Sequence, residues 1–364
     1  TATQHIMLAD LPIGGKPRRV VMQAPKNGFF YVLDAKSGAL LSAEKYVPVN
    51  WAERVDLVTG RPVENPKARY LEAQSLHVTG PLGGHNWQPM AYDPTAGLVF
   101  IPAMVLPGMY SNPKEWTYIP GVWNLGQGGF GEGPSGQRAP PNFGVPLSEL
   151  GGRLIAWDPV AGKARWSVRQ PVPWNSGLLA TAGGLVFGGF GKDLKAYTVA
   201  DGKVAWTWPV GMGVIASPMT YELDGEQYLA VMAGYGGAGG LNSAEPRRPG
   251  RLLVFKLGAT GKLPPLPAIP PRPPLDVSTA VASTGDPKQG ANLYGTYCGA
   301  CHSGGGYLPV LRTSPMILEP SIWKQVVHDG ALRQNGMAGF KRFMTPEEVE
   351  SIRAYLLSQL KPKA

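Results

Sequence analysis

The chain has 364 residues, of which 49 are glycine and 37 are proline. This share, about a quarter against roughly 12% in an average chain, disfavours a helical bundle because both residues are poor in helix interiors. The net charge of +9 is spread without a block of lysine or arginine, so we expect no nucleic-acid partner and a bias toward acidic proteins. No segment approaches the roughly 20 apolar residues of a membrane span. The length predicts two domains.

Residues 1–258 are a series of short apolar runs separated by Gly, Pro, Asn and Asp, a pattern typical of strands. Residues 154–166 and 194–206 repeat one another: each has a strand, a turn closed by glycine, and a second strand that ends in tryptophan. Shorter versions occur at 32–38 and 92–97. A four-stranded unit that recurs every 40–50 residues or so predicts the blades of a β-propeller. The alternative is a set of unrelated hairpins in a β-sandwich.

A linker is predicted at 259–282, because seven of the eleven residues from 264 to 274 are proline. Proline-rich chains favour the extended polyproline conformation, with a rise of about 3.1 Å per residue, and act as semi-rigid spacers. We therefore expect this segment to hold two domains at a set distance.

Residues 283–364 show the pattern of a small all-α domain. A helix within 285–302 ends in a cysteine motif, a short helix follows at 321–329, and a capping box at 345–348 begins the C-terminal helix. A domain of this size buries little core of its own. We therefore expect another group to fill its centre.

The two cysteines of the chain lie together in the motif Cys298-Gly-Ala-Cys301-His302. This is the sequence for covalent attachment of c-type haem: two thiols three positions apart reach the two vinyl groups, and the next residue turns its imidazole onto the iron. A redox dithiol is an alternative. Half of a zinc site is another, but no further cysteine exists to complete it. The sequence therefore predicts haem c on Cys298 and Cys301, with His302 as an iron ligand.

The sixth iron ligand is expected to be a methionine or a histidine from later in the domain. We favour Met337, because it lies in the glycine-flanked loop Gly-Met-Ala-Gly-Phe between two helices. The other candidates are Met316, Met344 and His328. The carbonyl of Pro309 could accept a hydrogen bond from the other nitrogen of His302 and fix the orientation of its ring.

Two further stretches are distinctive: 23–34, which contains Lys26, and 84–90, which reads Gly-His-Asn-Trp-Gln-Pro-Met. Together with the tryptophan-ended repeat and the C-terminal haem motif, they closely resemble the type II quinohaemoprotein alcohol dehydrogenases over the whole chain. The resemblance implies soluble periplasmic enzymes that use pyrroloquinoline quinone (PQQ), calcium and haem c. It also implies an eight-bladed propeller whose blades are locked by tryptophan-docking motifs.

The resemblance also exposes a shortfall, because eight such blades need more residues than the 258 that precede the linker. In the family, the catalytic aspartate, the other calcium ligands and a disulfide between adjacent cysteines lie upstream of anything matched here. Residue 1 is Thr, and no signal-peptide pattern follows it. We therefore expect this chain to be the C-terminal part of the enzyme, and we name no catalytic base within it.

The resemblance assigns the remaining quinone site residue by residue. Lys26 matches a basic residue beside the quinone oxygens, where a cation would stabilise the reduced quinone. Asn86 and Trp87 match an amide and an indole that contact the cofactor. Tyr235 and Gly236, in a glycine-rich loop, are expected to approach the quinone from the last blade.

Trp123 lies in the long loop 105–150, where the family builds its substrate pocket; core packing is the alternative for this side chain.

The expected function is the oxidation of a small-molecule alcohol by PQQ, with electrons passing through haem c to a soluble acceptor such as a blue copper protein or a cytochrome. One alternative is a PQQ and haem c dehydrogenase of another substrate, or the large subunit of a membrane-bound alcohol dehydrogenase. The other is a non-enzymatic electron-transfer or binding propeller fused to a cytochrome.

Overall fold

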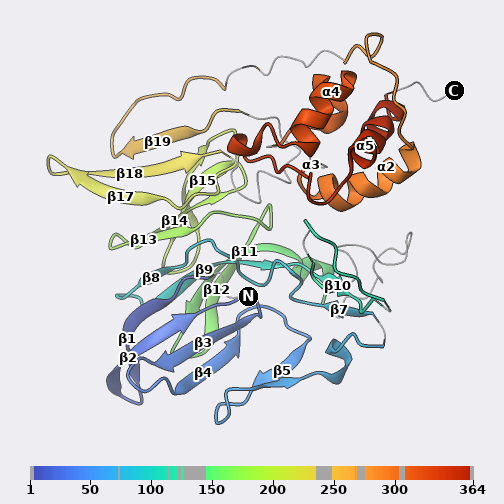
Figure 1. The fold of residues 1–364 in the computed structure, drawn as a ribbon. Coiled ribbons are helices and arrows are strands. Elements are labelled where there is room, and N and C mark those ends of the chain that lie inside the picture. Colours follow the sequence, from blue (N-terminus) through green and yellow to red (C-terminus); the bar gives the residue numbers. More distant parts are fainter. Residues whose placement is uncertain are drawn as a thin grey trace. The chain divides into compact units, whose positions relative to one another are not determined.

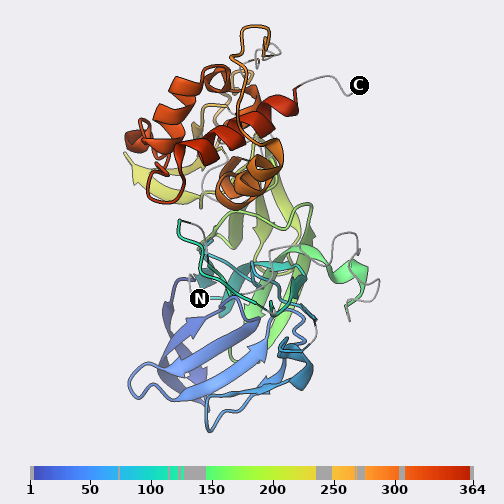
Figure 2. The same cartoon turned by 45° about the vertical axis from the view of Figure 1, so that its right-hand side comes forward.

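The computed structural model describes residues 4–72, 74–113, 115–121, 124–126, 145–234, 248–266, 268, 275–302 and 308–360. The chain divides into two compact units. Strands make up the first unit and helices the second, as Figures 1 and 2 show in blue to yellow and in orange to red. One boundary falls between residues 265 and 266, inside the predicted linker, and residues 115–121 also group with the helical unit.

The strand unit is built from antiparallel meanders in chain order. Three of the sheets have four strands, one has three, and two further sheets have two strands each. The large sheets are β1 (Met7–Ile13), β2 (Lys16–Gln23), β3 (Phe29–Asp34), β4 (Leu40–Lys45); β8 (Ala91–Asp93), β9 (Leu98–Val105), β11 (Gly151–Asp158), β12 (Lys163–Gln170); β13 (Leu178–Thr181), β14 (Leu185–Phe190), β15 (Asp193–Thr198), β16 (Val204–Pro209); and β17 (Met219–Leu223), β18 (Glu226–Ala233), β19 (Arg251–Lys256). The two-stranded sheets are the hairpin of β5 (Ala52–Val55) with β6 (Pro62–Glu64), and the pair of β7 (Ser75–His77) with β10 (Gly108–Tyr110), which are separated in the chain by β8 and β9.

Aromatic contacts join the first large sheet to the second and the third to the last. The rings of Phe30 and Trp157 lie 5.6 Å apart between the first and second sheets. Trp206 of β16 meets Phe255 of β19 edge-on, at 5.4 Å, between the third and the last. All eight residues of β9 are buried, as expected for a strand packed on both faces. Successive sheets therefore stack face to face, as blades do.

One turn recurs at the outer hairpins of the sheets. In each copy an aspartate Oδ1 accepts hydrogen bonds from the backbone N–H groups two and three residues later. The glycine four residues later has positive φ and donates to the aspartate carbonyl. The copies begin at Asp34, Asp56, Asp93 and Asp158. The sequence pattern had indicated three of these, and the structure adds the Asp56 turn of the β5–β6 hairpin.

The two matched tryptophans of the repeat behave differently. The indole Nε1 of Trp166 donates to the carbonyl of Val199 in the next sheet, at 2.9 Å. Its ring lies against Gly202, where a Cβ atom would come within 2.7 Å of the indole. Trp166 thus shows the predicted tryptophan docking, whereas Trp206 packs between Trp208 and Phe255.

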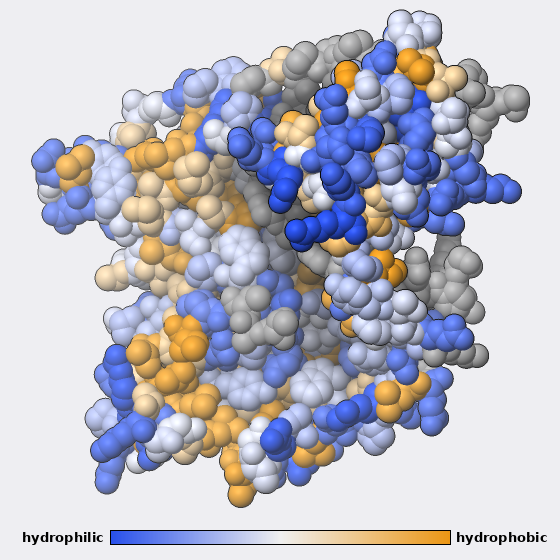
Figure 3. All heavy atoms as spheres, viewed as in Figure 1, coloured by the Kyte–Doolittle hydropathy of each residue, from blue (hydrophilic) through white to orange (hydrophobic). Residues whose placement is uncertain are grey.

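The last sheet carries adjoining apolar side chains on its exposed surface. Met219, Ala230 and Val254 pair across its three strands, and Met232 pairs with Leu252. Met219 is 56% exposed and Leu252 is 64% exposed. Figure 3 shows hydrophobic surface over these strands. Because the strand register places these side chains next to one another, they form one contiguous apolar group, which is typical of a packing surface.

The helical unit has the expected helices. A continuous helical run joins α2 (Pro287–Leu293), a π-helical turn at Tyr294–Cys298 and α3 (Gly299–His302). A second run joins α4 (Pro320–Trp323) to a π-helical turn at Lys324–His328.

The C-terminal helix α5 (Pro346–Ser358) begins with the predicted capping box. Thr345 Oγ1 accepts from the Glu348 N–H, while the Glu348 carboxylate accepts from the Thr345 N–H.

Candidate functional site

The helical run ending at His302 positions the three residues of the cysteine motif. Cys298 and His302 are buried, while Cys301 is exposed. Burial, with a smaller contribution from Cys301, raises the pKa of the Cys298 thiol to about 12. A redox dithiol needs a lowered thiol pKa, so this environment argues against that alternative.

His302 is oriented as the sequence predicted. Its Nδ1 lies 2.8 Å from the carbonyl oxygen of Pro309. A carbonyl can only accept a hydrogen bond, so Nδ1 carries the proton and Nε2 keeps its lone pair. This arrangement leaves Nε2 available to an iron atom.

The four candidate ligands for the distal side have different surroundings. Met344 is buried in the apolar cluster of the helical unit, so core packing accounts for it. His328 donates from Nδ1 to the Asp329 carboxylate at 2.6 Å. Met337 and Met316 are partly buried against the apolar cluster. Met337 follows Gly336 in a turn that closes with a bond from its N–H to the Leu332 carbonyl. The set of thiols, imidazole and thioether around an apolar cluster fits haem c, and Met337 remains the proposed ligand.

In the strand unit, Lys26 lies just after β2 and is held by a distant part of the chain. Its carbonyl accepts hydrogen bonds from Thr79 Oγ1 at 2.8 Å and from the Gly84 N–H at 3.0 Å. Gly83 lies directly against it, and a Cβ atom there would come within 2.5 Å of Lys26 Cγ. The segment 79–84 therefore fixes the backbone and the first part of the Lys26 side chain.

His85 joins the segment that carries Lys26 to the segment that carries Asn86 and Trp87. The imidazole is completely buried, with Nδ1 2.8 Å from the Ala24 carbonyl oxygen and Nε2 2.6 Å from the Gln88 carbonyl oxygen. Burial lowers its pKa to about 4, so the ring is neutral near pH 7 and donates through one nitrogen at a time. Sequence reasoning had overlooked His85, although it precedes Asn86 in the same motif.

Asn86 and Trp87 differ in exposure. The Asn86 amide donates to the Leu82 carbonyl at 2.8 Å and accepts from the Trp87 N–H at 2.9 Å, so it shapes its own loop. Trp87 is 40% exposed and can present its ring to a ligand. Their predicted contact with a quinone stays a prediction. Tyr235, Gly236 and Trp123 lie outside the described residues.

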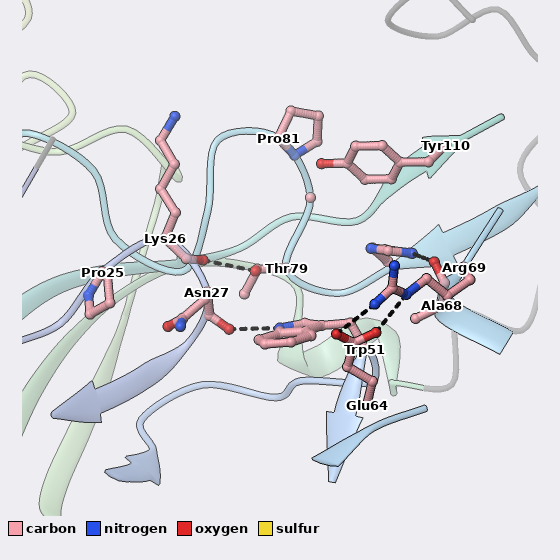
Figure 4. Close-up of a pocket in the computed structure, with 12 residues that line it drawn as sticks. Pro25, Lys26, Asn27, Trp51, Glu64, Ala68, Arg69, Thr79, Pro81 and Tyr110 are labelled. Atoms are coloured by element: carbon pink, nitrogen blue, oxygen red, sulfur yellow. Dashed lines mark hydrogen bonds and ion pairs between the residues drawn. The ribbon is translucent and has the colours of Figure 1, made fainter. Parts of the chain in front are cut away.

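A cavity of about 690 Å³ lies beside Lys26 within the strand unit (Figure 4). One wall is aromatic: Trp51 donates from Nε1 to the Asn27 carbonyl, and Tyr110 lies 4.7 Å from the His77 ring. Its volume is in the range of sites for organic ligands. In Figure 4 the Lys26 side chain extends away from a bidentate ion pair between Glu64 and Arg69, which also lines the cavity.

Calcium, by contrast, has no matching group of ligands here. Among the residues that the structure describes, no cluster of three His, Cys, Asp or Glu side chains could hold a metal ion. The described part of the chain likewise has no helix long and apolar enough to cross a membrane.

Comparison with known proteins identifies relatives of both units. Residues 285–356 match the model of cytochrome c oxidase, cbb3-type, subunit III, and residues 152–229 match the β-propeller domain of glucose/ethanol/alcohol dehydrogenases. Over 99% of its length the chain is 43% identical to the quinohaemoprotein alcohol dehydrogenase ADH IIB of Pseudomonas putida, of which it covers 52%. The chain spans about half the length of the quinohaemoprotein alcohol dehydrogenases that it matches.

Two further relatives give the same result. The 1-butanol dehydrogenase (cytochrome c) of Thauera butanivorans is 39% identical over 98% of the chain, which spans 52% of that protein. The solved structure of ADHIIG from Pseudomonas putida HK5 has a TM-score of 0.81 and 36% identity, and the match covers 98% of this chain and 54% of that one. The predicted combination of a PQQ-type propeller and a cytochrome c domain is thus confirmed, with PQQ and haem c as the cofactors of this quinohaemoprotein family.

Proposed function

We infer that the complete protein is a periplasmic alcohol dehydrogenase that oxidises alcohols to aldehydes or ketones and passes the electrons to an external acceptor. The observation that supports this is the presence in one chain of a cavity lined by Lys26 in the strand unit and a haem-binding motif in the helical unit. When bound, PQQ supplies a two-electron acceptor and haem c a one-electron carrier. Each alcohol loses two electrons and two protons, so two molecules of a one-electron acceptor are reduced per turnover.

Lys26 would place a fixed positive charge where negative charge develops as the quinone is reduced. A preorganised cation acts mainly on the transition state and therefore on turnover. The Lys26 carbonyl accepts hydrogen bonds from Thr79 and Gly84, and the first part of its side chain packs on Gly83. The backbone that carries the ammonium group is therefore held in place.

In the helical unit, His302 would hold the haem iron through Nε2, while Cys298 and Cys301 attach the macrocycle. The hydrogen bond to Pro309 keeps the ring in one tautomer and one orientation. Met337 would be the second protein ligand of the iron, and a thioether ligand favours reduced iron. Calcium is proposed for the complete protein only, with ligands outside the described residues.

The net charge of +9 suits an acidic soluble acceptor such as a blue copper protein or a cytochrome.

The test uses the full-length protein, loaded with PQQ and calcium and carrying oxidised haem. Adding a primary alcohol without oxygen is expected to reduce the haem, as followed by its visible absorption. The matched control omits PQQ and should show no reduction. Haem that stays oxidised in the loaded protein, across a series of primary and secondary alcohols, would contradict the proposal.

A further inference from the structure

The loop that carries Met337 follows directly on the second helical run of the helical unit. That run ends at Gly330, which has a φ of +79°. The next N–H, that of Ala331, donates to the Gln325 carbonyl at 2.9 Å. A left-handed glycine followed by a bond back to the last turn is a usual end of a helix. The backbone conformation therefore explains why position 330 is a glycine.

After Met337 the chain returns to the same helix end. The Phe340 N–H donates to the Val327 carbonyl at 2.9 Å, and the next N–H, that of Lys341, donates to the His328 carbonyl at 2.9 Å. Carbonyls in the last turn of a helix have no partner within the helix, so the returning segment satisfies two of them. These bonds close the loop 332–341 onto the helix end.

The two ends of this loop touch at a pair of glycines. A Cβ atom at Gly339 would come within 2.7 Å of Gly330 Cα and within 3.1 Å of Gly330 N. A Cβ atom at Gly330 would in turn come within 3.0 Å of Gly339 Cα. Backbone atoms cannot turn aside as the end of a side chain can. Unlike Gly330, Gly339 has no left-handed backbone, so the close approach alone explains the glycine at position 339.

We propose that Gly339 is a positioning residue for Met337, because only a residue without a side chain lets the loop close on the helix end. This rests on the proposed function, in which Met337 is the second protein ligand of the haem iron. Met337 is partly buried against the apolar cluster, and its own N–H is bonded to the Leu332 carbonyl. The closed loop would keep the thioether on the iron and external ligands away from it. That arrangement suits a one-electron carrier.

The proposal predicts how easily an external ligand replaces Met337. Imidazole can reach the iron only when the loop opens, so its apparent dissociation constant is the intrinsic constant divided by the open fraction. A methyl group at position 339 crowds the closed loop and leaves the open loop free of strain, so it raises the open fraction. We expect imidazole to bind about tenfold more tightly to Gly339→Ala than to the wild type.

The test titrates imidazole into the oxidised 364-residue chain carrying haem c and follows the visible absorption. The matched control is Gly295→Ala in the same unit: Gly295 is exposed, and no described atom beyond its neighbours lies within 4 Å of an added Cβ. This control should bind imidazole as the wild type does, while Gly339→Ala binds it about tenfold more tightly. Equal affinities in the wild type and in Gly339→Ala would overturn the proposal.

A double-mutant cycle separates positioning of Met337 from a general effect on the helical unit. Met337→Ala removes the proposed ligand and should itself bind imidazole more tightly than either glycine variant. Adding Gly339→Ala to Met337→Ala should then change the imidazole affinity no further, because the loop has no ligand left to position. A further tenfold change in the double variant would show that Gly339 acts without Met337 and would also overturn the proposal.

Phe340→Leu is the second variant, in case Gly339→Ala does not fold around haem. The Phe340 ring meets Tyr297 edge-on at 5.8 Å, so the change loosens the returning segment and keeps an apolar side chain. It should tighten imidazole binding about threefold, and an unchanged affinity would count against the proposal in the same way.

Failure of the ligand assignment gives a different result from failure of the proposal. If Met337 does not bind the iron, Met337→Ala will keep the wild-type imidazole affinity and the near-infrared sulfur-to-iron band. If Met337 binds the iron but Gly339 does not position it, Met337→Ala will lose the band while Gly339→Ala behaves as the wild type. Neither result depends on PQQ or on an alcohol, so both are independent of the proposed dehydrogenase activity.

Discussion

The two units build their candidate sites in opposite ways. In the helical unit, Cys298, Cys301 and His302 lie within five positions of one helical run, and the orienting Pro309 follows seven residues after His302. In the strand unit, Lys26 is held by Thr79 and Gly84, more than fifty residues away. The haem-binding motif thus depends on residues that are close in sequence, whereas the site of Lys26 forms only when two distant segments pack together. Local sites tolerate changes in the fold around them better than assembled sites do.

The largest expected difference between the two units is in their stability when Arg353 is replaced. Its guanidinium is completely buried and forms a bidentate pair with Glu350. Removing one partner of a buried ion pair leaves an uncompensated charge and costs about 3–5 kcal/mol. Arg353→Ala should therefore lower the free energy of unfolding of the helical unit by about that amount, because Glu350 and three carbonyls lose their donor. Urea denaturation followed by haem absorption for the helical unit and by tryptophan fluorescence for the strand unit checks this. An equal loss in both transitions would contradict separate stability.

A second prediction concerns the pH dependence of the strand unit. Burial lowers the pKa of His85 from 6.5 to about 4, so the unfolded chain binds a proton in a range where the folded chain does not. His85 therefore makes stability fall as the pH drops from about 6.5 to 4, by about 3 kcal/mol. Chemical denaturation at a series of pH values should show this loss in the wild type and a flatter curve in His85→Gln. Identical slopes would mean that His85 does not stay neutral when buried.

The smallest effect compares the two tryptophans of the repeat. Trp166→Phe removes the hydrogen bond to the Val199 carbonyl and should cost about 0.5–1.5 kcal/mol beyond the loss of ring area. Trp206→Phe is the matched control, because that ring packs against Phe255 and the substitution there removes only packed ring area. Thermal unfolding of both variants measures the difference. Equal losses would show that docking to the carbonyl adds nothing to packing.

Much of the helical unit could be predicted from sequence because its signals are local. The Cys-x-x-Cys-His spacing, the capping box at Thr345 and the carbonyl of Pro309 all act within a few residues of one another. The turns at Asp34, Asp93 and Asp158 were equally readable, since one aspartate and one glycine define each.

Contacts between distant segments explain what the sequence could not reveal. The bridge from His85 to Ala24 and the hydrogen bonds of Arg251 and Arg353 are contacts to backbone carbonyls, which have no sequence signature. The turn at Asp56 was not predicted because its strands, β5 and β6, have only four and three residues. Trp206 has the same place in the repeat as Trp166, but the contacts of each indole depend on the neighbouring sheet.

We propose that the strand unit carries out the quinone chemistry and the helical unit the one-electron transfer, each with its own residues. The most direct test measures the absorbance of both cofactors after one alcohol addition to full-length Lys26→Ala and Met337→Ala. Lys26→Ala should slow PQQ reduction by about 10²–10³-fold while leaving the haem spectrum and potential unchanged. Met337→Ala should abolish the near-infrared sulfur-to-iron band and shift the haem potential, with PQQ reduction unchanged. A Lys26→Ala enzyme within about threefold of wild-type turnover, or a Met337→Ala haem that keeps the band, would contradict the account.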